Sequence, residues 1–221
     1  MERLKILKNH ITPLVNVSET ESLILLTLNR PQTLNSLNFE MLFSIIHYLE
    51  LAKSTNRSWL ITGEPKKFLG SGGDLVLTTE EFLQIPEYIR TLHHMFYLTT
   101  KVESISLWTG YVIGSTAGLA CSCQLRVAFP SSKYSMPETE IGLFPNVGGS
   151  FFLSHNPPAH IGLYLGLTGH TLKGPDCYFY GFCKYFVQEE DYEQLISSIR
   201  HSENPSKVLE SFHKEPKKGK S

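Results

Sequence analysis

The sequence predicts an α/β fold, in which strands and helices alternate along a single chain. Short apolar runs typical of buried strands alternate with longer stretches whose apolar residues recur at helical spacing. Glycine-rich turns follow two of the strand-like runs and lead toward helices. This alternation favours a layered core with right-handed crossovers over a sandwich or a helical bundle. The length of 221 residues is that of one domain.

Composition and charge exclude several other classes of protein. The chain is 41% hydrophobic and 19% charged, which is typical of a globular domain and not of a fibrous or low-complexity chain. Its net charge is −1, so nucleic-acid binding would have to be local. No apolar run approaches the roughly 18–20 residues of a membrane-spanning helix, and we expect no membrane insertion.

The first elements are a predicted β-hairpin and an amphipathic helix. Residues 14–17 and 22–28 are β-rich runs, and the polar residues 18–21 separate them. Asn38 is the expected N-cap of the helix. The apolar residues at helical spacing after it are Met41, Leu42, Ile45, Ile46 and Leu49.

The middle of the chain continues the alternation of strands and helices. Its small residues before position 123 are typical of a helix that packs closely on other backbone. The expected elements are a strand over 58–62, a glycine-rich stretch over 70–74, a helix over 79–100 interrupted near Pro86, a strand over 102–108, a helix over 114–123 and a strand over 125–129.

The last third predicts short helices and a basic tail. The expected elements are helices near 161–167 and 175–180, a strand over 185–187, and closing helices over 191–200 and 205–212, the last with Pro at its first position. We divide the chain into a leader (1–13), one domain (14–213) and a basic tail (214–221). The tail, with Lys217, Lys218 and Lys220, has nothing to bury, so we expect it to be disordered unless a partner holds it.

Four cysteines give no metal-binding pattern. Cys121, Cys123, Cys177 and Cys183 form no C-x-x-C pair, and no nearby histidines complete a zinc site. We expect buried, reduced thiols that act as small hydrophobes. The nine histidines are likewise expected to be structural or solvated.

Two glycine-rich turns are candidates for an anion-stabilising site. Ser71-Gly72-Gly73 and Gly114-Ser115 each follow a strand and precede a helix, so free backbone N–H groups can converge on one oxygen. Two such donors would form an oxyanion hole for a polarised carbonyl. The alternative is that both segments are ordinary tight turns with no role in binding. The chain has neither G-x-x-x-x-G-K-[ST] nor G-x-G-x-x-G, which disfavours a phosphate cradle in these turns.

Glu138 is the candidate acid–base residue. It stands beside apolar residues, and Pro137 restricts its backbone. Partial burial would raise its pKa toward the range useful for proton transfer. A helix-capping or surface glutamate is the alternative. The nucleophile motif G-x-S-x-G and the metalloprotease motif H-E-x-x-H are absent.

An ordered set of motifs resembles the enoyl-CoA hydratase/isomerase (crotonase) superfamily. The motifs are Asn29-Arg30-Pro31, residues 35–37, residues 71–74, residues 137–145 and Gly148-Gly149. Residues 136–169, 172–174 and 176–181 are most similar to the 3-hydroxyisobutyryl-CoA hydrolase branch. The resemblance covers roughly residues 14–213. It implies a crotonase-like core of repeated ββα units, an acyl-CoA ligand, thioester hydrolysis in valine breakdown, no required metal or other cofactor, and a mitochondrial location.

The resemblance also assigns roles to individual residues. It places the two oxyanion-hole amides on Ser71 and Ser115 and the catalytic glutamate on Glu138. The family's catalytic aspartate is here Asn146, which cannot ionise. The residues that the resemblance places at the CoA pocket are Asn35, Ser36, Leu37, Gly72, Gly73 and Asp74.

Other departures from the family pattern point to a weakened site. Gly-Gly-Gly is replaced by Gly114-Ser115-Thr116, and the two added β-carbons would narrow the site. An extra residue between Phe68 and Ser71 would re-aim the first amide. A glutamate of an upstream helix is replaced near Arg90 and Thr91. The usual C-terminal helical part is expected to be truncated, which would uncover the acyl pocket.

Three functions remain open from the sequence. The first is a catalytically degenerate homologue kept as a structural subunit of a large mitochondrial assembly, by analogy the mitochondrial ribosome. Its partners would be other protein subunits and ribosomal RNA, the RNA bound through the Lys-rich tail. The second is an active acyl-CoA thioester hydrolase that uses Glu138 and the two amides. The third is a regulatory module that binds CoA without turnover.

Overall fold

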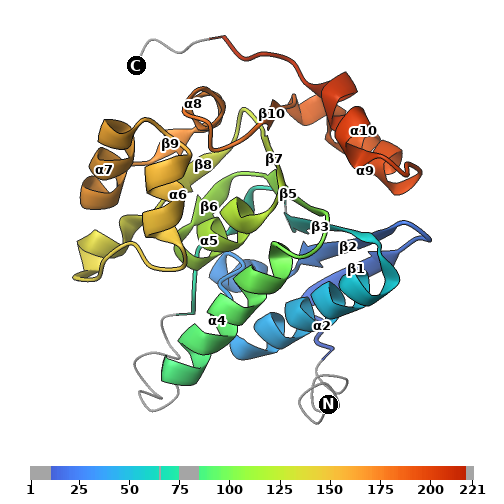
Figure 1. Ribbon diagram of the computed structural model, residues 1–221, viewed down its shortest axis with the longest axis horizontal. Coiled ribbons are helices and arrows are strands. Elements are labelled where there is room, and N and C mark those ends of the chain that lie inside the picture. Colours follow the sequence, from blue (N-terminus) through green and yellow to red (C-terminus); the bar gives the residue numbers. More distant parts are fainter. Residues whose placement is uncertain (1–10, 65, 75–84, 218–221) are drawn as a thin grey trace.

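The computed structural model describes residues 11–64, 66–74 and 85–217 and has the expected α/β architecture (Figure 1). Its larger sheet has the strand order β1-β2-β3-β5-β7-β10. These strands are β1 (Val15–Glu19), β2 (Leu23–Leu28), β3 (Ser58–Gly63), β5 (Ser104–Trp108), β7 (Leu125–Ala128) and β10 (Tyr185–Phe186). The smaller sheet consists of β4 (Phe68–Gly70), β6 (Tyr111–Ile113), β8 (Lys133–Ser135) and β9 (Leu172–Lys173), in that order.

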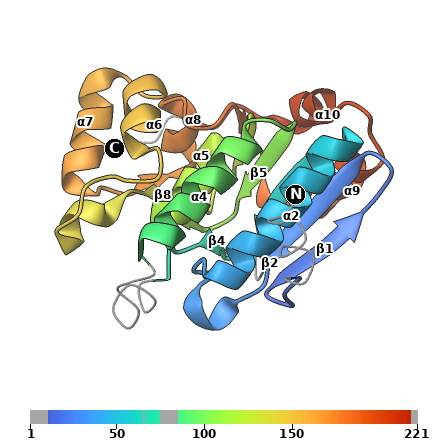
Figure 2. The ribbon, with the colours of Figure 1, turned by 60° about the horizontal axis from the view of Figure 1, so that its bottom comes forward.

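Helices surround the two sheets. The α-helices are α2 (Phe39–Thr55), α4 (Ile85–Thr99), α5 (Gly114–Ser122), α6 (Gly149–His155), α7 (Ala159–Thr168), α8 (Gly174–Phe179), α9 (Tyr192–Arg200) and α10 (Pro205–Phe212). The short 3-10 helices within the described residues are η1 (Pro31–Thr33), η3 (Pro137–Ile141) and η4 (Glu189–Asp191). In Figure 2, α2 and α4 lie side by side, and α9 and α10 lie at the other side of the larger sheet.

The ββα repeat is visible in the strand order. In β3–β4–α4, in β5–β6–α5 and in β7–β8–η3, the first strand joins the larger sheet and the second joins the smaller one. The strands β3, β5 and β7 pair in parallel, and so do β4, β6 and β8. Parallel strands end at the same edge of their sheet, so the turns that follow β4 and β6 meet there.

The larger sheet is buried on both faces. Along β2, Ile24 and Leu26 belong to the core that includes α2 and α4, whereas Leu23 and Leu25 belong to a second core with α9 and α10. This alternation is the period of two of a strand. The four cysteines are buried and unpaired, as expected. Burial raises the pKa of Cys121 to about 12, so this thiol stays protonated.

Several predicted elements are confirmed. The hairpin β1–β2 is antiparallel, with Val15 opposite Leu28. Asn38 caps α2, because its side chain accepts a hydrogen bond from the amide of Met41 at 3.0 Å. The last helix, α10, has the expected bounds. As a separate finding, none of the helices in the described ranges combines the length and the apolar composition of a membrane-spanning segment.

Other predictions need correction. Pro86 lies in the first turn of α4, where a missing N–H is tolerated, and the predicted interruption near it stays a prediction because residues 75–84 lie outside the described residues. The helix α6 and the strands β4, β6, β8 and β9 were not among the predicted elements. Parts of the predicted leader, helix and tail lie outside the described residues, at 1–10, 75–84 and 218–221, and so do Lys218 and Lys220.

Candidate active site

The two glycine-rich turns lie against each other. Gly72 has φ +109°, a conformation that favours glycine. A β-carbon on Gly72 would stand 3.6 Å from the backbone nitrogen of Ser115 and 3.3 Å from the carbonyl oxygen of Ile113. The turn after β4 therefore contacts the first turn of α5.

Thr116 ties these turns together. Its Oγ1 accepts a hydrogen bond from the amide of Gly72 at 3.2 Å, and the side chain is fully buried. It is not among the residues that line the cavity at the turns, whereas Ser115 is. The expected narrowing by Thr116 is therefore wrong, because its side chain points into the packing beneath the turn.

The extra residue before the first turn is accommodated within β4. Phe68 pairs with Tyr111 and Gly70 with Val112, so the register shifts by one residue between Phe68 and Gly70. Such a β-bulge absorbs an added residue within a strand.

The free amide of the first turn belongs to Gly73. The amide of Ser71 donates to the carbonyl of Leu34 at 2.9 Å, and that of Asp74 donates to the carbonyl of Leu37 at 2.9 Å. The amide of Ser71 already donates within the fold, so its predicted role as an oxyanion-hole donor is wrong. Among the described residues, no hydrogen bond involves the amide of Gly73.

Ser115 supplies the second amide. It is in the first turn of α5, where N–H groups have no acceptor within the helix. The positive end of the helix dipole adds to their attraction for an anion. Gly73 and Ser115 both line the cavity, so their N–H groups form the candidate oxyanion pair.

Glu138 faces the same turn. A β-carbon on Gly114 would stand 3.7 Å from Oε1 of Glu138. Its Oε2 is buried without a hydrogen-bond partner, and burial raises the pKa of this carboxyl. The side chain does not cap η3, which removes the alternative of a capping glutamate.

Asn146 lies on the same cavity wall and is held rigidly. Its Oδ1 accepts a hydrogen bond from the amide of Val147 at 2.7 Å, and its carbonyl accepts one from Gly149 at 2.6 Å. Val147 has φ +49°. The Asn146 side chain on this wall is an amide, which cannot ionise and so cannot act as a second acid or base.

The cavity has a volume of about 260 Å³. Its walls come from both turns, from α4, from η3 and from the segment before α6. The lining residues are Ser71, Gly72, Gly73, Asp74, Tyr88, Ile89, Leu92, Ile113, Gly114, Ser115, Pro137, Glu138, Glu140, Ile141, Leu143, Asn146 and Val147. Nothing in the sequence indicated Tyr88, whose hydroxyl donates to the carbonyl of Leu37 at 2.6 Å.

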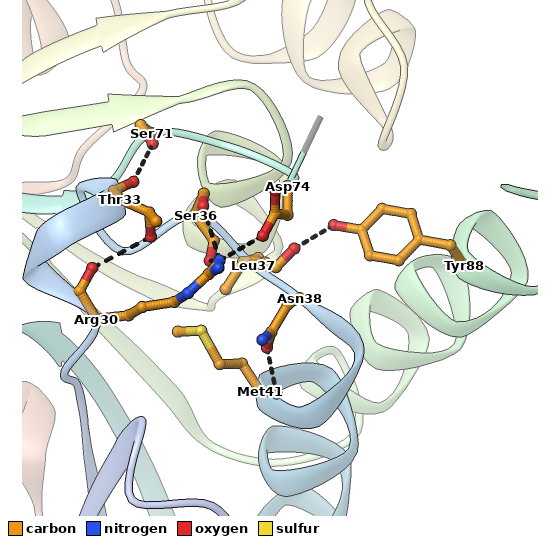
Figure 3. Close-up of polar contacts among 9 residues, drawn as sticks. All are labelled: Arg30, Thr33, Ser36, Leu37, Asn38, Met41, Ser71, Asp74 and Tyr88. Atoms are coloured by element: carbon orange, nitrogen blue, oxygen red, sulfur yellow. Dashed lines mark hydrogen bonds and ion pairs between the residues drawn. The ribbon is translucent and has the colours of Figure 1, made fainter. Parts of the chain in front are cut away.

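A buried polar cluster supports the first turn (Figure 3). Nη1 of Arg30 lies 2.5 Å from Oδ2 of Asp74 and also donates to the carbonyl and the hydroxyl of Ser36. The carbonyl of Gly72 accepts from the amide of Leu37 at 2.8 Å. These contacts fix the loop of residues 35–37 against the turn that carries Gly73.

The loop residues do not line the cavity. Asn35 and Leu37 are fully buried and Ser36 nearly so. The Asn35 amide group donates to the carbonyls of Glu64 and Leu69. These three side chains hold the loop, and the predicted place of the loop at a CoA adenine pocket stays a prediction. Gly72, Gly73 and Asp74 do line the cavity.

The described residues contain no group of three or more His, Cys, Asp or Glu side chains that could hold a metal ion. The cavity combines two backbone donors with the partly buried carboxyl of Glu138. Its other acidic lining residues are Asp74, which pairs with Arg30, and Glu140, which is exposed. Donors placed beside a carboxyl of raised pKa can polarise a carbonyl and exchange a proton next to it.

The ββα core thus carries paired backbone amides beside a partly buried carboxyl, an arrangement that can polarise a carbonyl group. The sequence profile of the enoyl-CoA hydratase/isomerase family matches residues 23–221. The chain belongs to this family.

Named relatives refine the position within the family. A mitochondrial 3-hydroxyisobutyryl-CoA hydrolase of Xenopus tropicalis is 33% identical over 232 residues, and the match covers 96% of this chain and 60% of the relative. The human mitochondrial 3-hydroxyisobutyryl-CoA hydrolase is 35% identical over 208 residues, with 87% and 53% covered. The chain thus spans just over half the length of these relatives.

Solved structures share the fold. A carnitinyl-CoA dehydratase from Mycobacterium thermoresistibile superposes with a TM-score of 0.83 at 26% identity, over 95% of this chain and 63% of that one. An enoyl-CoA hydratase from Rhodobacter sphaeroides gives a TM-score of 0.78 at 29% identity, over 86% and 59%.

Proposed function

We propose that the cavity binds an acyl-CoA thioester and hydrolyses it slowly. The carbonyl oxygen would accept hydrogen bonds from the amides of Gly73 and Ser115. Glu138 would take a proton from the attacking water and return it to the departing thiolate as the C–S bond breaks. The observation that carries the proposal is the partly buried Glu138 carboxyl, whose Oε2 has no hydrogen-bond partner and which lines the same cavity as these two amides.

Slow turnover follows from Asn146. A positioned acid or base contributes about 10²–10⁴-fold to a rate, and an amide cannot supply it. The chain would therefore be a degenerate member of its branch. No metal or other cofactor is required by this scheme, because the donors and the carboxyl belong to the chain.

The test is a thiol-release assay with 3-hydroxyisobutyryl-CoA, the substrate in the relatives' names. We expect a low rate for the parent that falls to background in Glu138→Gln. An exposed glutamate, Glu203, gives the control Glu203→Gln, which should keep the parent rate. Equal background rates for parent and Glu138→Gln would refute hydrolysis.

Calorimetry tests whether the chain binds CoA without hydrolysing a thioester. If the parent releases no thiol, titration with CoA still distinguishes a CoA-binding module from a chain with no ligand. Saturable heat that is lost on substitution of Ser115 by Pro, which removes one amide donor, would place the binding at this site. Circular dichroism of that variant would check that α5 still forms.

A second candidate function is that of a non-catalytic subunit in a larger mitochondrial assembly. The observation that favours it is an exposed apolar surface on α7 and the segment before α6, where Leu167 is 66% and Phe144 70% exposed. Large apolar patches mark interaction sites. The mitochondrial ribosome is one such assembly, and ribosomal RNA could contact the basic tail at Lys217.

Affinity capture from mitochondria tests this candidate. Copurification with a defined set of subunits, retained in Glu138→Gln, would support a structural role. Recovery of only free monomer or homo-oligomer would contradict it. Absence of the tagged chain from mitochondria would contradict the location, which is inferred from the names of the relatives.

A further inference from the structure

A second cavity, with three lysines on its wall, lies at the opposite end of the smaller sheet. The candidate active site is where β4 and β6 end, whereas this cavity of about 470 Å³ is where β4, β6 and β8 begin. Lys67 precedes β4, Tyr111 begins β6 and Lys133 begins β8, and all three line the cavity. A ligand there would not compete with one at the candidate active site.

Backbone contacts hold this corner rigidly. The carbonyl of Gly110 accepts a hydrogen bond from the amide of Lys133 at 2.7 Å, and the amide of Tyr111 donates to the carbonyl of Lys67 at 3.4 Å. Gly110 has φ +52°, and a β-carbon there would stand 1.5 Å from the carbonyl oxygen of Lys67. Only glycine permits this approach, which brings the segments carrying Lys67 and Lys133 together.

The cavity carries lysines without carboxylate partners. Lys66 pairs with Glu193, and Oε1 of Glu189 accepts the amide of Ser131 at 2.7 Å. Within the described ranges, Lys67 and Lys133 make no ion pair. On a chain of net charge −1, this is a local concentration of positive charge.

Two further contacts involve the ammonium group of Lys133. Lys133 lies directly opposite Lys173 in the antiparallel pair β8–β9, and like charges opposite each other destabilise a sheet. Nζ of Lys133 lies 4.8 Å from the ring centroid of Tyr111, a cation–π distance. A bound anion would relieve the repulsion, and the ring holds the ammonium group at the cavity wall.

We propose that this cavity binds the diphosphate group of a small molecule. The compact ammonium groups of lysines bind phosphate oxygens as point charges. The volume exceeds that needed for a single phosphate and suits a diphosphate, free or in a nucleotide. The presence of Glu189 on the cavity wall favours a compact anion held by the lysines over an extended nucleic-acid backbone, whose track would be uniformly basic.

Calorimetric titration of the full chain with inorganic pyrophosphate and with ADP tests the proposal. We expect saturable binding of at least one, weakened about tenfold by Lys67→Gln and by Lys133→Gln, as for loss of a charged hydrogen bond. Lys53→Gln, which alters an exposed lysine in the last turn of α2, should bind like the parent. Binding of pyrophosphate alone would assign the site to the diphosphate itself, and stronger binding of ADP would assign it to a nucleotide.

Three outcomes would overturn the proposal. They are no saturable heat with either anion, equal weakening in Lys53→Gln and Lys133→Gln, and tighter lysine-dependent binding of a single-stranded oligoribonucleotide than of either anion. Equal melting temperatures of the ligand-free variants would show that lost binding does not reflect lost folding. The readout is independent of thioester turnover, so it holds whether or not the proposed hydrolysis is found.

Discussion

At the scale of single residues, the candidate site depends on which polar groups lack partners. Glu138 has an unpartnered oxygen and the amide of Gly73 is free, whereas the amide of Ser71 is not. Glu138 and Asn146 could be found from the sequence because their motif is contiguous. The assignment of Ser71 failed because its acceptor, Leu34, approaches only in the folded chain.

The raised pKa of Glu138 predicts a pH-dependent stability. An acid whose pKa is raised by folding binds its proton more tightly in the folded state. Its ionisation therefore costs stability as the pH rises through the unfolded and then the folded pKa. We expect Glu138→Gln to melt at a higher temperature than the parent at pH 7. The difference should shrink below about pH 4, near the ordinary pKa of glutamate.

Thermal melts of parent and variant between pH 3 and pH 8 would measure this effect. Glu203→Gln, at an exposed position, should show no such pH-dependent difference. A Glu138→Gln variant that is less stable at pH 7 would contradict the inferred cost of burying the charge.

Asn146→Asp should raise thioester hydrolysis by at least about 10²-fold, the lower range for a positioned acid or base. The aspartate can accept the Val147 amide as Asn146 does, so the turn should be kept. Thiol release measures the change. Asn146→Ala, which restores no carboxylate, should stay at or below the parent rate, and an unchanged rate in Asn146→Asp would show that the second carboxylate is not what limits turnover.

At the scale of elements, the site is made by two short strands that end side by side. The alternation that reveals a strand needs about four to eight residues, and β4, β6 and β8 have three each. The smaller sheet was therefore not predictable from periodicity, although its turns were. The helix α6 begins at Gly149, where the sequence reads as a turn.

The prediction at the scale of elements concerns the hydrogen bond by which Thr116 joins the two turns. Thr116→Val keeps the shape of the side chain but leaves the buried amide of Gly72 without its acceptor. We expect a loss of about 1–3 kcal/mol in the free energy of unfolding, measured with urea. Thr116→Ser should recover most of it. A neutral Thr116→Val would mean that the two turns are held by backbone packing alone.

At the scale of the whole molecule, the buried strands were the most predictable part. Apolar residues dominate β2, β3, β5 and β7 because the larger sheet is covered on both faces, although Ser104 and Ser106 interrupt the run in β5 and Arg126 the run in β7. The region around α6 and α7 behaves differently, since it exposes the side chains that a core would bury. No local pattern distinguishes such a surface from a buried helix, because both read as apolar sequence.

The last prediction concerns the exposed apolar surface around α6 and α7. Leu163 and Leu167 are 64% and 66% exposed and line an apolar groove of about 400 Å³ with Phe144. We expect the isolated chain to self-associate or to bind a hydrophobic dye through this groove. The double variant Leu163→Asp/Leu167→Asp should lower both, measured by light scattering and dye fluorescence. Its melting temperature should change little because neither side chain is buried, whereas Leu165→Asp, at a buried position of the same helix, should unfold the protein. A monomeric parent that binds no dye would show that the groove is too shallow to hold a partner.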